Sequence, residues 1–91
     1  MRRAHRVDAN QGRIVAALRK CGVAVRSLAG IGDGVPDLLA YSARSGYVLL
    51  EVKVPGEKLT EDQERFHREW PGRIHIVETI DDALRACGVL G

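Results

Sequence analysis

Two short, mostly apolar runs lie in the middle of the chain, on either side of a turn-rich pentapeptide. The first run covers residues 34–41 and the second covers 47–53, and Ser-Ala-Arg-Ser-Gly separates them. Apolar runs interrupted by a short polar segment predict an antiparallel β-hairpin, here with a five-residue loop. The natural register pairs Tyr41 with Tyr47 across that loop.

This register brings acidic side chains together on one face of the hairpin. Side chains alternate between the two faces of a strand, so Asp37 and Glu51 stand opposite each other with Cβ atoms roughly 5 Å apart. Lys53 lies one diagonal step away, and a slip of two residues would keep Glu51 on the same face. The other face carries the residues expected in the core, Val48, Leu50 and Val52.

Helical and strand patterns flank the hairpin. The expected elements are, in order, a helix over 8–20 with Asp8 as its N-cap, a strand over 23–28, the two hairpin strands, a helix over 60–70, a strand over 73–78 and a helix over 79–87. This order predicts a single α/β domain over 1–91, with a small mixed sheet flanked by helices and a basic tail over 1–7.

Two glutamines are predicted to face inward from the helices. Gln11 falls in the middle of the apolar face of the first helix, where it either closes a capping box or belongs to a site. Gln63 shares a helical stripe with Phe66 and Trp70, which are expected in the core. His67 is expected to be an exposed helix residue.

Composition is that of an ordinary folded domain, with 45% hydrophobic and 29% charged residues. No apolar stretch is long enough for a membrane span and no signal peptide is visible, so the expected location is the cytoplasm. The net charge is +2, and basic residues gather in the first third, where Asp8 is the only acid. That asymmetry suits a polyanionic partner, although a solvated helix face explains it equally well.

Other common sites are not supported. The two cysteines lack a Cys-x-x-Cys spacing and the three histidines are scattered, so no zinc site is expected. The glycine-rich segment 29–34 leads into Val35-Pro36, which forces an extended backbone, so it cannot form the helix N-terminus of a dinucleotide site. Its glycines are expected to allow a sharp turn and a close approach of a substrate backbone to Asp37.

The opposed carboxylates of Asp37 and Glu51 predict a metal site. Two like charges on an otherwise apolar hairpin repel each other unless a cation lies between them or one carboxyl stays protonated. Carboxylate oxygens suit Mg²⁺ or Mn²⁺, which take few protein ligands and keep waters. The competing interpretation is a surface hairpin on which Glu51 pairs with Lys53.

The motif Gly34-Val-Pro-Asp37, followed on the next strand by Glu51-Val-Lys53, resembles the PD-(D/E)xK nuclease superfamily. More closely, the chain is similar to small stand-alone VRR-NUC domains of the phage type. The similarity runs through most of the chain, over the segments Asp8–Gln11, Gly32–Asp37, Leu49–Lys53 and Leu59–Gln63 and as far as Trp70.

The resemblance implies a restriction-endonuclease-like core of order α-β-β-β-α-β with a C-terminal helix. It also implies that Asp37, Glu51 and the main-chain carbonyl of Val52 bind Mg²⁺ or Mn²⁺. Lys53 would orient or help deprotonate the attacking water, and Gln63 would lie beside the site.

Relatives often carry a glutamate on the first helix as a further metal ligand. Here Gln11 would be the substitute, and because an amide is a weaker ligand than a carboxylate, one ion is expected rather than two. The basic residues expected to contact DNA are Arg2, Arg3, Arg6, Arg26 and Lys58.

The implied activity is metal-dependent hydrolysis of DNA that leaves 5′-phosphates. A structure-selective or nicking endonuclease working as a homodimer is the first hypothesis, since one small subunit offers little surface to grip a duplex. The alternatives are a nucleic-acid-binding accessory module with little activity of its own and, more distantly, a hydrolase of small phosphoesters. Base-specific recognition is not expected, because no base-reading helix is recognisable.

Overall fold

The computed structural model describes residues 2–90, with side chains from residue 9 onward. The seven elements follow the predicted order of types and are α1 (Arg2–Lys20), β1 (Ala24–Ser27), β2 (Leu38–Ser42), β3 (Gly46–Val52), α2 (Glu61–Glu69), β4 (Ile74–Val77) and α3 (Ile80–Ala86). The predicted α/β class with a small mixed sheet is confirmed.

The four strands form one sheet in the order β1-β2-β3-β4. The pairs β1–β2 and β2–β3 are antiparallel, and β4 runs parallel to β3. The predicted hairpin register is confirmed, because Tyr41 pairs with Tyr47. The loop is shorter than predicted, however, since Ser42 already pairs with Gly46. Gly46 adopts a φ of 71°, the left-handed conformation with which three-residue hairpin loops commonly end.

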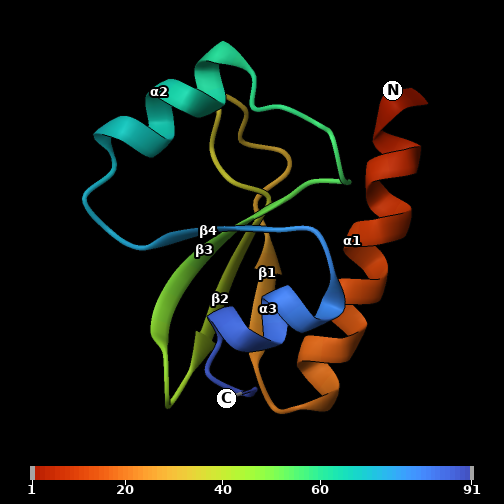
Figure 1. Cartoon of the computed structure of the whole chain (residues 1–91), viewed down its shortest axis with the longest axis vertical. Coiled ribbons are helices and arrows are strands. Elements are labelled where there is room, and N and C mark those ends of the chain that lie inside the picture. The colour runs from red at the N-terminus through yellow and green to blue at the C-terminus, as the bar shows by residue number, and fades with distance from the viewer. Residues whose placement is uncertain (1, 91) are drawn as a thin grey trace.

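The core lies between the sheet and the two helices α1 and α3. Figure 1 shows α3 in front of the sheet and α1 running along its side. Ile14 and Leu18 of α1 are completely buried, and burying such a side chain stabilises the fold by about 1.5–3 kcal/mol. The strands contribute the alternate residues that the sequence predicts, among them Val48, Leu50 and Val52.

The first helix begins at Arg2, six residues before the predicted N-cap at Asp8. The segment expected as a basic tail is therefore helical, and Asp8 lies inside α1. Residues 2–7 contain neither glycine nor proline and include the good helix formers Arg and Ala, so an established helix can extend through them.

Helix α2 packs differently from the prediction. Its stripe of Phe66 and Trp70 was expected in the core, yet Trp70 is 46% exposed and α2 has no fully buried residue. The two rings stack on each other with centroids 5.1 Å apart. In Figure 1, α2 lies beyond the end of the sheet opposite to the β2–β3 turn. Because α1 and α3 close the core, α2 is left to cover the strand ends.

Gly34 brings the segment before β2 against the first turn of α2. Its φ is 76°, and a Cβ at this position would overlap the main-chain carbonyl of Asp62. The close approach expected from the glycine-rich segment is thus made by a helix of the same chain. Only glycine combines this conformation with this contact.

We expect Gly34→Ala to lower the free energy of unfolding by about 2 kcal/mol or more, because alanine is strained at positive φ and its methyl group displaces α2. Gly30→Ala is the matched control, since Gly30 lies in the same loop with open space around its Cα and no positive φ. Urea denaturation followed by circular dichroism measures both. Equal stability of the two variants would contradict the packing described here.

Candidate active site

The predicted acidic pair and lysine come together beneath α2, where β2 begins and β3 ends. Asp37 directly precedes β2, Glu51 lies in β3, and Lys53 directly follows β3. Leu38 pairs with Leu50, so one further step of the register places Asp37 opposite Glu51. The loops from these strand ends lead toward α2 (Figure 1).

Asp37 is held by the main chain of the neighbouring strand. Its Oδ2 accepts a hydrogen bond of 2.7 Å from the N–H of Val52. The next N–H, that of Lys53, instead donates to Val77 on the β4 side at 2.9 Å. Because the N–H and C=O of one strand residue point toward the same neighbour, the Val52 carbonyl is directed toward the Asp37 side, past the end of β2.

Glu51 is completely buried, and its pKa is raised to about 8. Desolvation is the main cause, followed by repulsion from Asp37 and a hydrogen bond with that carboxyl group, while the charge of Lys53 acts in the opposite direction. The competing interpretation of an exposed ion pair is wrong, because Lys53 is buried as well. The two carboxyl groups therefore share one site.

Gln63 links Lys53 to the rest of the site. Its Oε1 accepts hydrogen bonds from Lys53 Nζ at 2.8 Å and from the N–H of Thr60 at 2.9 Å. Its Nε2 donates to Glu51 Oε2 at 3.4 Å. Thr60 closes the capping box of α2 in return. The inward orientation predicted for Gln63 is confirmed.

His67 also belongs to this group, and its predicted exposure was wrong. Its side chain is only 17% exposed, and Nε2 lies 3.3 Å from Glu51 Oε1. Burial and, secondarily, the nearby charge of Lys53 lower the pKa of His67, which favours the neutral ring. The spacing from Gln63 to His67 is one helical turn and could have revealed the shared direction.

Gln11 is buried as predicted, but it lines a groove of about 470 Å³ between α1 and β1. No hydrogen bond joins it to Asp37 or Glu51 among the described residues. Its neighbour Asn10 contacts the candidate site, since Nδ2 donates to the carbonyl of Lys53 at 3.4 Å.

The donor set at these strand ends fits one hard cation. Over the described residues, no three side chains of His, Cys, Asp or Glu are grouped to hold a metal. Two carboxylates and the Val52 carbonyl remain as oxygen donors. Mg²⁺ takes few protein oxygens and keeps several waters, so this set suffices for a single ion.

Comparison with known proteins agrees with this geometry. Residues 3–73 match the VRR-NUC domain family. The chain belongs to that family. A solved structure described as a VRR-NUC domain is similar with a TM-score of 0.63, at 25% sequence identity over 90% of this chain and 98% of its own. No curated protein sequence matches.

The basic residues expected to contact DNA are distributed around the VRR-NUC domain. Arg26 is exposed on the edge strand β1, and Lys58 is exposed on the loop between β3 and α2. The side chains of Arg2, Arg3 and Arg6 lie outside the described residues. Between residues 2 and 90, none of the helices is both long and apolar enough to cross a membrane.

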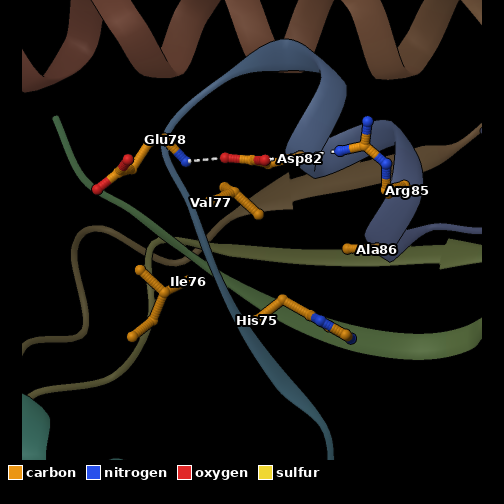
Figure 2. Close-up of a pocket in the computed structure, with 7 residues that line it drawn as sticks. All are labelled: His75, Ile76, Val77, Glu78, Asp82, Arg85 and Ala86. Carbon is orange, nitrogen blue, oxygen red and sulfur yellow. Dashed lines mark hydrogen bonds and ion pairs between the residues drawn. The ribbon is translucent and has the colours of Figure 1, made fainter. Parts of the chain in front are cut away.

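A pocket of about 420 Å³ lies elsewhere, between β4 and α3. Figure 2 shows Asp82 and Arg85 reaching it from α3 and His75 from β4. Asp82 accepts hydrogen bonds from the N–H groups of Glu78 and Thr79 and lies 3.7 Å from Arg85, which explains its lowered pKa. Since neither acidic residue of the candidate site lines this pocket, it is separate from the candidate site.

The buried Glu51 makes stability depend on pH in the metal-free protein. In the unfolded chain this carboxyl ionises near 4.5, whereas in the native state it keeps its proton up to about 8. Between these values the native state binds more protons, so the free energy of unfolding falls as the pH rises. The slope is at most about 1.4 kcal/mol per pH unit. Below this range both states are protonated and the contribution is fully present.

We expect Glu51→Gln to remove this fall, because the amide does not ionise. Denaturant unfolding at a series of pH values, in the presence of a chelator, measures the difference between this variant and the wild type. Glu64→Gln is the control, since Glu64 is an exposed carboxylate on α2. A wild-type profile parallel to that of Glu51→Gln would show that Glu51 ionises at the same pH in the native and the unfolded state.

Proposed function

We propose that this VRR-NUC domain is a DNA endonuclease that depends on Mg²⁺ or Mn²⁺ and is either selective for branched or junction DNA or nicks DNA. The observation that carries the proposal is the buried pair of Asp37 and Glu51, with the Lys53 amine held beside it by Gln63. A pair of buried carboxyl groups that resists full ionisation is strongly stabilised by a divalent cation.

In this proposal Asp37, Glu51 and the Val52 carbonyl hold the ion. The ion would act as a Lewis acid toward the phosphodiester and lower the pKa of the attacking water. Membership in a nuclease family supports this assignment. The hydrogen bond from the Val52 N–H keeps Asp37 oriented before an ion arrives.

Lys53 is placed to act on water and phosphate. An ammonium group has three hydrogens, and the Lys53 Nζ donates one of them to Gln63 Oε1. Glu57 lies 3.6 Å from Nζ on the partly exposed side. The remaining hydrogens can orient the attacking water and donate to a phosphate oxygen, where positive charge offsets the charge of the transition state.

DNA binding would use exposed basic residues around this site. Arg26 and Lys58 are available on the surface, and the net charge of the chain is +2. Phosphate contacts of this kind position a duplex without reading its sequence. This agrees with a nuclease that recognises the shape of its substrate rather than its bases.

A homodimer is part of the proposal, and the open face of the sheet is the surface we assign to it. Tyr41 and Tyr47 form an exposed aromatic pair there, with ring centroids 4.8 Å apart, and Tyr47 is 71% exposed. Ile76 is half exposed beside the buried Glu51 on the same face. Exposed aromatic and aliphatic side chains of this kind are common in interfaces between proteins. A second copy would hold two sites in a fixed relation.

The accessory-module alternative has one observation in its favour. Gln11 offers only a neutral amide where the resemblance implies a glutamate, and no hydrogen bond joins it to Asp37 or Glu51 among the described residues. Such a module would bind nucleic acid without cutting it.

We expect Lys53→Met to reduce cleavage of branched or nicked DNA by about a hundredfold or more, because the substitution removes the group that serves water and phosphate. Methionine retains the apolar stem of the side chain, so the fold and DNA binding should persist. Cleavage in Mg²⁺ or Mn²⁺ is followed on gels and binding by fluorescence anisotropy. Linear duplex of the same sequence is the substrate control.

Two results would separate the hypotheses. Binding by the wild type without cleavage in either metal would favour the accessory module. Turnover of small phosphoesters with no action on any DNA would instead favour the phosphoesterase hypothesis.

We expect Tyr47→Glu to convert the homodimer into monomers, because a carboxylate cannot be buried unpaired in an apolar interface. Val89→Glu is the control, since Val89 is also partly exposed but lies at the far end of α3, against the β2–β3 turn. Light scattering after gel filtration gives the mass of each variant. A monomeric wild type would refute the dimer without affecting the assignment of the metal site.

A further inference from the structure

Both carboxyl oxygens of Glu51 face side chains of the same helix. Gln63 Nε2 lies 3.4 Å from Oε2, and His67 Nε2 lies 3.3 Å from Oε1. Gln63 and His67 are four residues apart, so their side chains leave α2 on one face, one turn above the other. One helix, α2, therefore contacts both oxygens of the Glu51 carboxyl group.

The amide of Gln63 makes two other hydrogen bonds. Its Oε1 accepts them from Lys53 Nζ and from the N–H of Thr60, which fixes the plane of the amide. The contact that remains for Glu51 is long for a hydrogen bond. Among the described residues, the His67 side chain has one hydrogen-bond partner, which is Glu51. The imidazole of His67 is therefore the group on α2 that hydrogen-bonds only to the Glu51 carboxyl group among the described residues.

The protonation of the Glu51 carboxyl group determines which side chain donates the hydrogen bond between His67 and Glu51. A carboxylate that holds an ion has no proton and accepts hydrogen bonds only. The His67 Nε2 must then carry the hydrogen, which the neutral ring can provide in one of its two tautomers. Partners of this kind orient metal-ligating carboxylates and typically change metal affinity by about 10–100-fold when removed.

Two local features position helix α2 over the candidate site. The capping box of Thr60 and Gln63 fixes its first turn, and Gly34 lets the segment before Asp37 pack directly against Asp62. His67 follows one turn later on this anchored helix. Its placement therefore depends on the same segment that carries the opposing carboxylate.

We propose that His67 is a positioning residue, which donates from Nε2 to Glu51 Oε1 and holds this carboxylate in the orientation that binds the divalent ion. The proposal rests on the proposed function, since it takes Glu51 as a metal ligand. It adds a residue outside the Asp, Glu, Lys and Gln motif.

The test measures binding of Mn²⁺ alone, through the electron paramagnetic resonance signal of the free ion. His67→Leu removes the donor while keeping a side chain of moderate size, and His67→Asn keeps an amide that is too short to reach Oε1. His67→Gln places an amide nitrogen near the original Nε2. We expect the first two variants to weaken Mn²⁺ binding by about tenfold or more and His67→Gln to restore it.

A merely structural role would give a different pattern. Melting temperatures in a chelator would then fall while the Mn²⁺ affinity of the folded protein stayed unchanged. Glu64→Gln, on the exposed side of α2, is the control for both measurements. If His67→Leu does not fold, the comparison of His67→Asn with His67→Gln decides alone.

The outcomes separate this inference from the proposed function. Equal Mn²⁺ affinity of the wild type, His67→Asn and His67→Leu would overturn the positioning role and leave the metal site intact. Equal weakening by all three variants would also overturn it, because the amide donor should rescue. A wild type that binds no Mn²⁺ at millimolar concentration would refute the metal site and the positioning role together.

Discussion

The buried carboxyl group of Glu51 is the constraint around which this end of the molecule is arranged. A carboxylate with no access to water is costly unless charge and hydrogen bonds compensate for it. Burial, followed by the repulsion from a second carboxyl group, that of Asp37, raises the pKa of Glu51 to about 8. Lys53, Gln63 and His67 supply the polar surroundings on the other sides. A divalent cation would complete a set that is otherwise short of positive charge.

The fold separates the part that provides stability from the part that provides chemistry. Helices α1 and α3 close the core on one face of the sheet with apolar side chains such as Ile14, Leu18 and Ala83. Helix α2 has no fully buried residue, yet two of its side chains contact Glu51. The candidate site thus includes side chains from a helix that has no residue in the hydrophobic core. Its position depends on its capping box and on the tight contact at Gly34.

The open face of the sheet extends from the candidate site to the exposed hairpin end. Along β3 it runs from the exposed Tyr47, at the hairpin end, to the buried Glu51 beneath α2. Large exposed apolar side chains in a small domain are typical of interaction surfaces. In the proposed dimer, a partner on this face would lie next to the candidate site. Assembly and chemistry would then use neighbouring parts of one face.

The sequence alone determined the features that local geometry specifies. Period-two alternation in the hairpin fixed which side chains share a face, so the pairing of Tyr41 with Tyr47 and the approach of Asp37 to Glu51 followed from it. The helical period likewise turned Gln63 inward. These patterns depend on neighbours in the chain or directly across a strand pair, where few arrangements are possible.

Only the tertiary structure decided which surfaces are covered. The exposure of Trp70, the burial of His67 and the groove that Gln11 lines depend on where each helix lies against the sheet. The periodicity of a helix shows which residues share a face, but not what that face meets. Since α1 and α3 fill the core, α2 lies at the strand ends, and that placement brings His67 to Glu51.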